Sequence, residues 1–329
     1  MEFLLLLLIP VALGSLLIGG GGDDDDTAPE TDTVTGTDLN DVMRGATAAD
    51  AIDGGDGDDL LFGYGGADTL QGGEDNDFID GGNSNDLLIG DAGHDVLAGA
   101  VGDDTLYGGQ GNDLLSGGAG DDSLIGGNGD DLLIGSTGAD QLYGGNGDDV
   151  LDGAIPTPYL TVTEAFSDLR EQFSLAFHSR YGENATDEDF NRFMRDLASE
   201  AADYAPDMLY GGAGIDYVAG DNGDTLTGGV DADYFELSWV SGNAPVHITD
   251  YSSSDQGITV YVDEPSDTLP EFGMRDAADG TGVELVIDGA VVAALANATV
   301  ADLSGEQIVM ILPGDDAVYS AIRLPTLAA

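Results

Sequence analysis

The sequence predicts a mainly β protein, a parallel β-roll (β-solenoid) of nonapeptide repeats with an inserted α-helical hairpin and a β-rich C-terminal cap. Three observations predict this architecture. A nine-residue pattern repeats thirteen times without a gap between residues 36 and 152. The pattern then gives way to a stretch of helical periodicity and resumes near residue 207. Beyond residue 236 the glycines are replaced by short runs of β-forming residues.

The N-terminus is apolar over residues 3–22, which approaches the ~20 residues that a membrane-spanning helix needs. Residues 1–22 therefore predict a membrane anchor, with a cleaved signal peptide and a buried helix as the alternatives. Glu2 stands where a signal peptide carries basic residues, and the best cleavage pattern, Ala12-x-Gly14, is a weak one. Residues 23–35, which begin with four aspartates, predict a flexible acidic linker.

Each repeat unit has the pattern G-G-x-G-x-D-x-U-x, in which U is aliphatic, and the units predict a roll over residues 36–153. Glycine permits the backbone angles of a tight loop. The x-U-x part predicts a three-residue strand whose middle side chain points inward. That side chain is aliphatic in all thirteen units, from Met43 to Leu151. One unit cannot bury it alone, so neighbouring units must stack.

The sixth position is aspartate in all thirteen units. Stacked units place these carboxylates in columns, where like charges repel unless a cation neutralises them. Ca²⁺ suits a flexible cage of carboxylate and carbonyl oxygens, whereas Mg²⁺ requires a tighter octahedron. Transition metals favour His and Cys, but the repeats contain only His94 and the chain has no cysteine. The columns therefore predict several calcium sites.

This pattern resembles the RTX (hemolysin-type) calcium-binding nonapeptide repeat family, many of whose members are exported by type I secretion. The resemblance implies two units per turn, with Ca²⁺ held between loops by sixth-position aspartates of units i and i+2 and by loop carbonyls. The implied metal ligands are Asp59, Asp68, Asp77, Asp86, Asp95, Asp104, Asp113, Asp122, Asp131, Asp140, Asp149, Asp216 and Asp233. The implied carbonyl ligands lie near Gly55, Gly57, Gly66, Gly93, Gly102, Gly111, Gly120, Gly129, Gly138 and Gly147.

Four units depart from glycine at the fourth position. Leu39 and Ala48 replace it in the first two units, which predicts a metal-poor N-terminal cap at Asp41 and Asp50. Two later units have Asp75 and Ser84 instead. Aspartate tolerates left-handed backbone angles better than serine does, so the loop that contains Ser84 is predicted to be the weaker site.

Odd-numbered and even-numbered units would lie on opposite faces of a roll with two units per turn. The seventh position, which points outward, is mostly polar in the even units. In the odd units it is always apolar: Val42, Leu60, Phe78, Val96, Leu114, Leu132 and Val150. Such a stripe is a contiguous exposed patch unless something covers it.

Residues 154–206 interrupt the repeat and predict a helical hairpin with one apolar side. Thr161 and Glu164 form a capping box at the start of its first helix. Two interpretations of the apolar stripe stay open. The hairpin folds back over it, or the stripe binds a second copy or another protein while the hairpin is a separate docking element. Residues 207–236 predict a continuation of the roll.

Residues 237–329 predict a β-rich cap that closes the open end of the roll. Asp288-Gly289 is a strong hairpin-turn signal, and EQIVMIL predicts a late strand. The resemblance implies an uncleaved secretion signal in this C-terminal region. As an export route, that signal competes with the apolar N-terminus.

The composition argues against nucleic-acid binding and the motifs argue against catalysis. Formal net charge is -57 and the chain has no lysine, so there is no basic patch to replace the counterions of a phosphate backbone. The sequence contains neither H-E-x-x-H nor G-x-S-x-G. Carboxylate pairs such as Asp58-Asp59 recur with the repeat, so calcium explains them better than acid/base work does.

The sequence therefore predicts a calcium-binding, calcium-folded structural or surface protein without catalytic activity. We expect it to be exported and extracellular or at the cell surface, with anchoring through residues 3–22 as a further expectation. Its expected partners are calcium ions and an export machinery. The alternative is an adhesin or matrix module that docks a partner through the apolar stripe or the helical hairpin.

Overall fold

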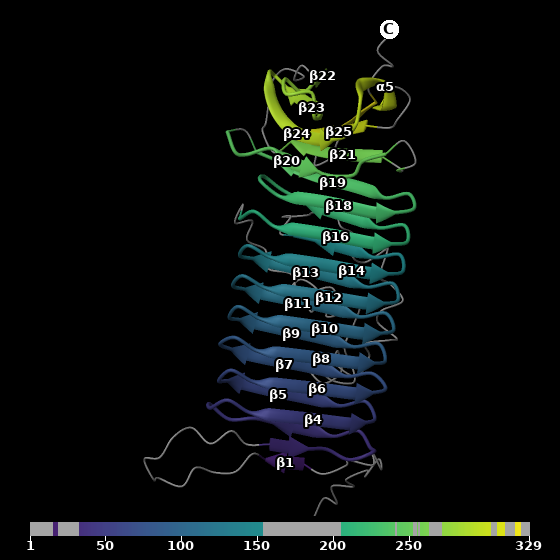
Figure 1. The fold of residues 1–329 in the computed structure, drawn as a ribbon. Helices are drawn as coiled ribbons and strands as arrows, with labels where there is room; N and C mark the ends of the chain where they lie inside the picture. Colours follow the sequence, from purple (N-terminus) through teal and green to yellow (C-terminus); the bar gives the residue numbers. More distant parts are fainter. Residues whose placement is uncertain are drawn as a thin grey trace, which may run out of the picture.

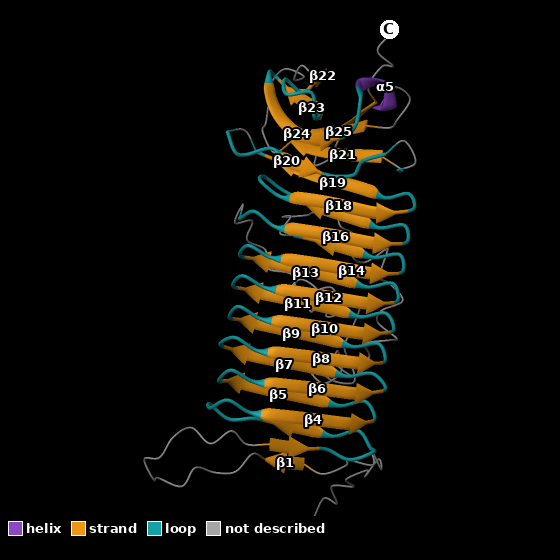
Figure 2. Ribbon diagram, viewed as in Figure 1, coloured by secondary structure: helices purple, strands orange, loops and turns teal. Residues whose placement is uncertain are grey.

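The computed structural model describes residues 16–18, 33–153, 205–240, 242–252, 255, 257–262, 272–303, 308–312 and 320–323. These residues form an elongated column in which the chain alternates between two sheets (Figure 1, Figure 2). Along the column each strand pairs in parallel with the strand two places later in the chain. Paired residues in neighbouring turns of the repeat are 18 apart, as in Leu106 and Leu124. The predicted mainly β parallel solenoid is confirmed.

The first sheet, which we call the odd sheet, contains the strands of the odd units. In order it consists of β1 (Leu16–Ile18), β3 (Val42–Arg44), β5 (Leu60–Gly65), β7 (Phe78–Asn83), β9 (Val96–Val101), β11 (Leu114–Ala119), β13 (Leu132–Thr137), β15 (Val150–Asp152), β17 (Tyr217–Gly220), β19 (Tyr234–Trp239), β21 (Gly257–Val262), β25 (Ile308–Leu312) and β26 (Ser320–Arg323).

The second sheet, the even sheet, contains the strands of the even units. In order it consists of β2 (Thr33–Thr35), β4 (Ala51–Asp56), β6 (Thr69–Glu74), β8 (Leu87–Ala92), β10 (Thr105–Gln110), β12 (Ser123–Asn128), β14 (Gln141–Asn146), β16 (Met208–Ala213), β18 (Thr225–Val230), β20 (Val246–Ile248), β24 (Ala290–Ala296), β23 (Gly282–Ile287) and β22 (Phe272–Asp276). A single turn of helix, α5 (Val300–Leu303), follows β24.

The core is one continuous row of aliphatic side chains between the two sheets. The eighth-position residues from Met43 to Leu151 belong to one buried cluster and are at most 2% exposed. Burying one such side chain contributes about 1.5–3 kcal/mol relative to leaving it exposed. The stack therefore supplies the burial that no single nonapeptide can achieve.

Most strands of the roll are longer than the three residues that the pattern predicted. β10, for example, spans six residues and includes Gly108 and Gly109 from the next unit. Gly109 has φ +123°, and a Cβ there would lie 2.1 Å from the carbonyl oxygen of Asp91 in the preceding turn. Because glycine has no Cβ, the backbones can stack this closely, and pairing continues through the glycine pair.

The register of both sheets continues across residues 154–204. β14 pairs with β16, where Leu142 lies opposite Leu209, and β15 pairs with β17. The backbone N–H of Asp140 donates to Oδ1 of Asp207, 67 residues later, at 2.7 Å. The predicted helical hairpin itself lies outside the described residues, apart from its last two positions.

Three residues of the apolar N-terminus, Leu16–Ile18, form strand β1. β1 lies inside the segment predicted to be a membrane anchor or signal, and it pairs in parallel with β3. The rest of residues 1–32 lies outside the described residues. In the part of the chain that the structure describes, no helix is both long and apolar enough to span a membrane.

The C-terminal end of the column changes from parallel to antiparallel pairing. β22, β23 and β24 form an antiparallel meander on the even sheet, and β25 pairs with β26 on the odd sheet. The predicted hairpin turn is confirmed, since Asp288 and Gly289 join β23 to β24 with φ of 49° and 86°. Figure 1 shows β22–β25 and α5 together at this end of the column.

Candidate metal centre

The sixth-position aspartates form two columns, one at the start of each sheet's strands. The odd column contains Asp41, Asp59, Asp77, Asp95, Asp113, Asp131, Asp149, Asp216, Asp233 and Asp255. The even column contains Asp50, Asp68, Asp86, Asp104, Asp122, Asp140, Asp207 and Asp224. Every predicted aspartate ligand lies in one of these columns.

After the first aspartate of each column, one oxygen of the carboxylate is fixed by the preceding turn. Oδ1 of Asp131 accepts a hydrogen bond from the backbone N–H of Asp113 at 2.9 Å. In the even column, Oδ1 of Asp140 accepts one from the N–H of Asp122 at 2.8 Å. This contact repeats along both columns, so the backbone sets the direction in which each carboxylate points.

The other oxygen, Oδ2, is buried without a hydrogen-bond partner along the regular part of the array. This holds for Asp59, Asp68, Asp77, Asp86, Asp95, Asp104, Asp113, Asp122, Asp131, Asp149 and Asp216. A buried carboxylate oxygen without a partner is costly unless a proton or a cation compensates it. The repetition of this cost in turn after turn indicates a built site rather than an isolated packing defect.

The ends of the columns differ, because there the chain itself satisfies Oδ2. Oδ2 of Asp41 accepts from the backbone N–H and the hydroxyl of Thr37, at 2.7 and 2.9 Å. Oδ2 of Asp50 accepts from the N–H of Ala46 at 2.7 Å. At the other end, Oδ2 of Asp255 accepts from the N–H of Ser252 at 2.6 Å. These contacts fit the prediction that the first two units are metal-poor.

Backbone carbonyl oxygens converge on the same place as Oδ2. At Gly126, a Cβ would lie 2.3 Å from Oδ2 of Asp131 and 2.7 Å from the carbonyl oxygen of Gly144. Gly108 shows the same pair of contacts, with Oδ2 of Asp113 and the carbonyl of Gly126. The described residues contain no group of three His, Cys, Asp or Glu side chains suited to a metal. A cation here must therefore use carbonyl oxygens beside the carboxylates.

The predicted carbonyl ligands stay a prediction, and the structure brings further carbonyl oxygens to the columns. The oxygens of Gly93, Gly111 and Gly129 face the fourth-position glycine one turn later, where a Cβ could not fit. The first-position carbonyls, such as those of Gly126 and Gly144, were not among the predicted ligands. The signal was present in the sequence, since the first position is glycine in all thirteen units.

Two aspartates that were not among the predicted ligands also lie in the columns. Asp207 is buried in the even column, and its Oδ1 accepts the N–H of Asp140. Its place at the sixth position of a unit with Leu209 at the eighth was the available signal. Asp255 extends the odd column beyond the last repeat, with its Oδ1 3.5 Å from the backbone nitrogen of Asp233. No repeat pattern marks Asp255 in the sequence.

Burial raises the pKa of several column aspartates above that of a free carboxyl. The pKa of Asp77 and of Asp113 rises to about 9, and that of Asp122 to about 8. Burial is the largest cause, and neighbouring carboxylates of the same column add to it, while the backbone N–H donor opposes it. Near neutral pH each column therefore holds protons or cations.

Several units of the repeat place a non-glycine residue in the left-handed region. Asp75 and Ser84, at the fourth position, have φ of 73° and 84°. Ala100 and Ser136, at the second position, also have positive φ of 76° and 80°. Backbone of this kind costs roughly 1–2 kcal/mol for a residue with a Cβ. The second-position strain was not anticipated, because only departures at the fourth position were considered.

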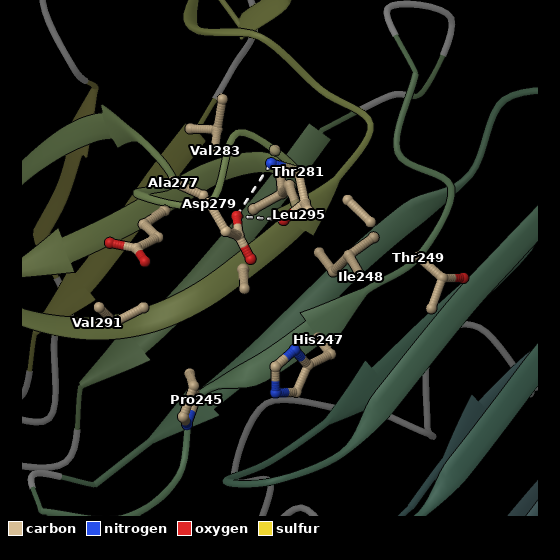
Figure 3. A pocket seen from close by; sticks show the side chains of 14 residues that line it. Pro245, His247, Ile248, Thr249, Ala277, Asp279, Thr281, Val283, Val291 and Leu295 are labelled. Atoms are coloured by element: carbon tan, nitrogen blue, oxygen red, sulfur yellow. Dashed lines mark hydrogen bonds between the residues drawn. The ribbon is translucent and has the colours of Figure 1, made fainter.

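Two of the three histidines of the chain, His94 and His247, lie in the described residues. Nδ1 of His94 accepts the backbone N–H of Asn112 at 2.7 Å, as Asn and Asp side chains do in neighbouring loops. A hollow of about 610 Å³ in the C-terminal region is lined by His247, Asp279 and Glu284 among apolar residues (Figure 3). The Asp279 carboxylate is held by the N–H and hydroxyl of Thr281, which lower its pKa.

Comparison with known families agrees with the geometry of the columns. Residues 35–70, 62–97, 89–124, 98–133 and 125–155 match the family model of the RTX calcium-binding nonapeptide repeat. No curated protein sequence matches the chain significantly. The stacked repeats and the solenoid fit a calcium-binding structural protein.

Proposed function

Because residues 35–155 consist of RTX calcium-binding nonapeptide repeats, we propose that the chain is an exported structural protein that calcium folds outside the cell. The observation that carries this proposal is the row of buried Oδ2 atoms without a hydrogen-bond partner. Most of them, such as those of Asp113 and Asp131, lie near a backbone carbonyl oxygen of the next turn, which gives a set of hard oxygen donors. We propose no catalytic role for the chain.

The ligands of each site would come from consecutive turns of one column. Oδ2 of Asp113 and Asp131 with first-position glycine carbonyls such as those of Gly126 and Gly144 would supply oxygens in the odd column. Asp104 and Asp122 would do so in the even column. Bound calcium supplies positive charge that replaces the protons which the raised pKa values otherwise require.

The strong negative charge of the chain supports export, because calcium is scarce inside the cell and abundant outside it. With a formal net charge of -57, the chain repels itself wherever free calcium is scarce, and an expanded chain passes an exporter easily. Extracellular calcium-binding modules typically have dissociation constants of about 0.1–1 mM. Sites in that range stay empty in the cytosol and fill outside the cell, where calcium binding and folding become one equilibrium.

The test is a count of bound ions on the full chain by equilibrium dialysis, with Ca²⁺ and Mg²⁺ compared at equal concentration. Several Ca²⁺ ions per chain, with little Mg²⁺ bound, support the proposal. Equal binding of both ions, or none, contradicts the calcium part. Fractionation of the producing cells tests export separately, and a chain found only in the cytosol contradicts that part.

A further inference from the structure

The middle of the even sheet presents an uncharged face to solvent. β10, β12, β14, β16 and β18 contain no acidic or basic residue over their whole length, although 64 of the 329 residues of the chain are acidic. Tyr107 on β10 and Met208 on β16 are each 39% exposed, and Gln141 on β14 is exposed as well. This outward side of the sheet, which we call the even face, is therefore open to solvent.

Large side chains form a row along the even face, one from each strand. These ninth-position residues pair in register from strand to strand: Ile89, Tyr107, Ile125, Tyr143 and Tyr210. The row, which we call the ring row, covers four strand spacings, or roughly 19 Å at about 4.8 Å per strand. The rings of Tyr143 and Tyr210 are stacked, with their centroids 5.0 Å apart and their planes inclined by 2°. Such stacking holds the rings in one orientation before a ligand binds.

Polar side chains flank the ring row on both sides. Two residues before it in their strands lie Thr105, Ser123 and Gln141. Three residues after it lies the amide row, which is exposed and paired in register and consists of Gln110, Asn128 and Asn146. Nδ2 of Asn146 donates to Oδ1 of Asn128 at 3.0 Å. A side-chain amide has two N–H donors and an oxygen with two lone pairs, so the amide row can also bond to a ligand.

We propose that the ring row and the amide row bind a neutral, extended β-linked glycan that lies along the column. Tyrosine rings offer apolar surface to the C–H groups on the face of a sugar ring, and their hydroxyls add polar contacts. Amides donate to and accept from the hydroxyls along the edges of the sugar chain. A straight row with the fixed spacing of a sheet suits an extended chain. The proposal concerns the folded roll and does not depend on export.

Charge argues for a neutral ligand. The formal net charge of -57 repels polyanions, and the five strands offer no basic side chain that could attract one. Hydroxyl-rich sugars need no counter-charge, because amides and tyrosine hydroxyls satisfy them. The even face therefore fits a neutral glycan better than a nucleic acid or an acidic polysaccharide.

Shape and area argue against a second copy of the chain as the occupant. The ring row is roughly 19 Å long and the six-residue strands are roughly 20 Å long, at about 4.8 Å per strand and 3.3 Å per residue. The resulting area of about 400 Å² is half of the roughly 800 Å² that each partner buries in a standard protein interface. Two chains of the same high charge also repel each other. A single sugar chain needs only a narrow strip.

The test is calorimetric titration of cellohexaose, a neutral and extended β-linked glucan, into the full chain folded in saturating calcium. Tyr107→Ala removes an exposed member of the ring row. Tyr234→Ala is the matched control, since Tyr234 is 43% exposed but lies on β19 of the odd sheet. We expect Tyr107→Ala to weaken binding about tenfold and Tyr234→Ala to leave it unchanged. Absence of cellohexaose binding by the folded chain overturns the proposal, and so does an equal loss in both variants.

A second pair of variants tests the amide row without touching a ring. Asn128→Ala removes the middle amide of the row on β12, and Asn83→Ala removes an exposed amide at the same repeat position on β7 of the odd sheet. We expect several-fold weaker cellohexaose binding for Asn128→Ala alone, because its hydrogen bonds to the sugar are lost. Unchanged binding in Asn128→Ala contradicts the role given to the amide row. Sedimentation of the titrated sample checks the occupant, and a chain that dimerises through the even face without binding cellohexaose overturns the proposal.

Discussion

At the scale of single residues, the first-position glycine and the sixth-position aspartate depend on each other. The carboxylate and a carbonyl oxygen of the next turn lie so close to the Cα of Gly126 that no side chain fits. The glycine therefore does more than permit a turn, because it leaves the space in which the two oxygens converge. Loss of that space removes the site while leaving the aspartate in the sequence.

We expect Gly126→Ala to raise the calcium concentration at the midpoint of folding several-fold, because the new Cβ displaces Oδ2 of Asp131 or the carbonyl of Gly144. Gly65→Ala is the matched control, since a Cβ at Gly65 meets nothing within 4 Å. The midpoints are compared by circular dichroism during calcium titration. Similar midpoints for the two variants would contradict the convergent geometry.

Ser84→Gly is expected to stabilise the calcium-loaded roll. Ser84 has φ 84°, a conformation that costs a serine roughly 1–2 kcal/mol and costs glycine almost nothing. Glycine loses more chain entropy on folding, by about 0.5–1 kcal/mol, which leaves a net gain of up to about 1 kcal/mol. Urea denaturation in excess calcium measures it, and a destabilised variant would show that this loop is not strained.

At the scale of strands and turns, the aspartate columns have a regular middle, where Oδ2 has no hydrogen-bond partner, and ends where Oδ2 accepts hydrogen bonds from the chain. The middle units leave Oδ2 bare, whereas Thr37, Ala46 and Ser252 supply donors at the ends. If the columns bind calcium as proposed, metal binding stops where the chain itself satisfies Oδ2, although the aspartates continue.

Asp122→Asn and Asp50→Asn test this division. Asp122 has a neighbour on each side in its column, and its own Oδ2 has no hydrogen-bond partner. Its loss should therefore remove about one to two Ca²⁺ ions per chain. Oδ2 of Asp50 already accepts the N–H of Ala46, so its replacement should leave the ion count unchanged. Equilibrium dialysis gives both counts, and equal losses would show that the cap also binds metal.

The sequence predicted the elements whose signal repeats and missed those that depend on contact between turns. Inward leucines such as Leu115 follow from alternation within one unit, and the columns follow from the period of nine. The six-residue strands do not, because pairing through Gly109 depends on the carbonyl of Asp91 in another turn. The place of Asp255 in the odd column arises from the fold of a region without repeats. The apolar stripe was visible in the sequence, but the burial of its middle residues, Phe78, Val96, Leu114 and Leu132, was not.

At the scale of the whole molecule, the column charges couple folding to protons as well as to calcium. The folded-state pKa values of Asp77 and Asp113 are about 9, against 3.8 for a free carboxyl. Between these values the folded chain holds protons that the unfolded chain has released. The stability of the metal-free roll is therefore fully present below about pH 4 and is lost as the pH rises through the folded-state pKa values.

In chelator, we therefore expect a larger β signal near pH 5 than near pH 9, measured by far-UV circular dichroism on the same sample. Excess calcium should remove most of this difference, because the cation replaces the protons at neutral and alkaline pH. A metal-free β signal that grows with rising pH would contradict the burial of these carboxyls.

The most direct test of the central claim, that calcium locks the roll, is a calcium titration of the chain near pH 8 followed by far-UV circular dichroism. The account predicts a cooperative transition from coil to β structure near millimolar calcium, absent with magnesium and reversed by chelator. A chain that is already fully β in chelator at that pH, or that ignores calcium, would show that the aspartate columns are a scaffold that needs no metal.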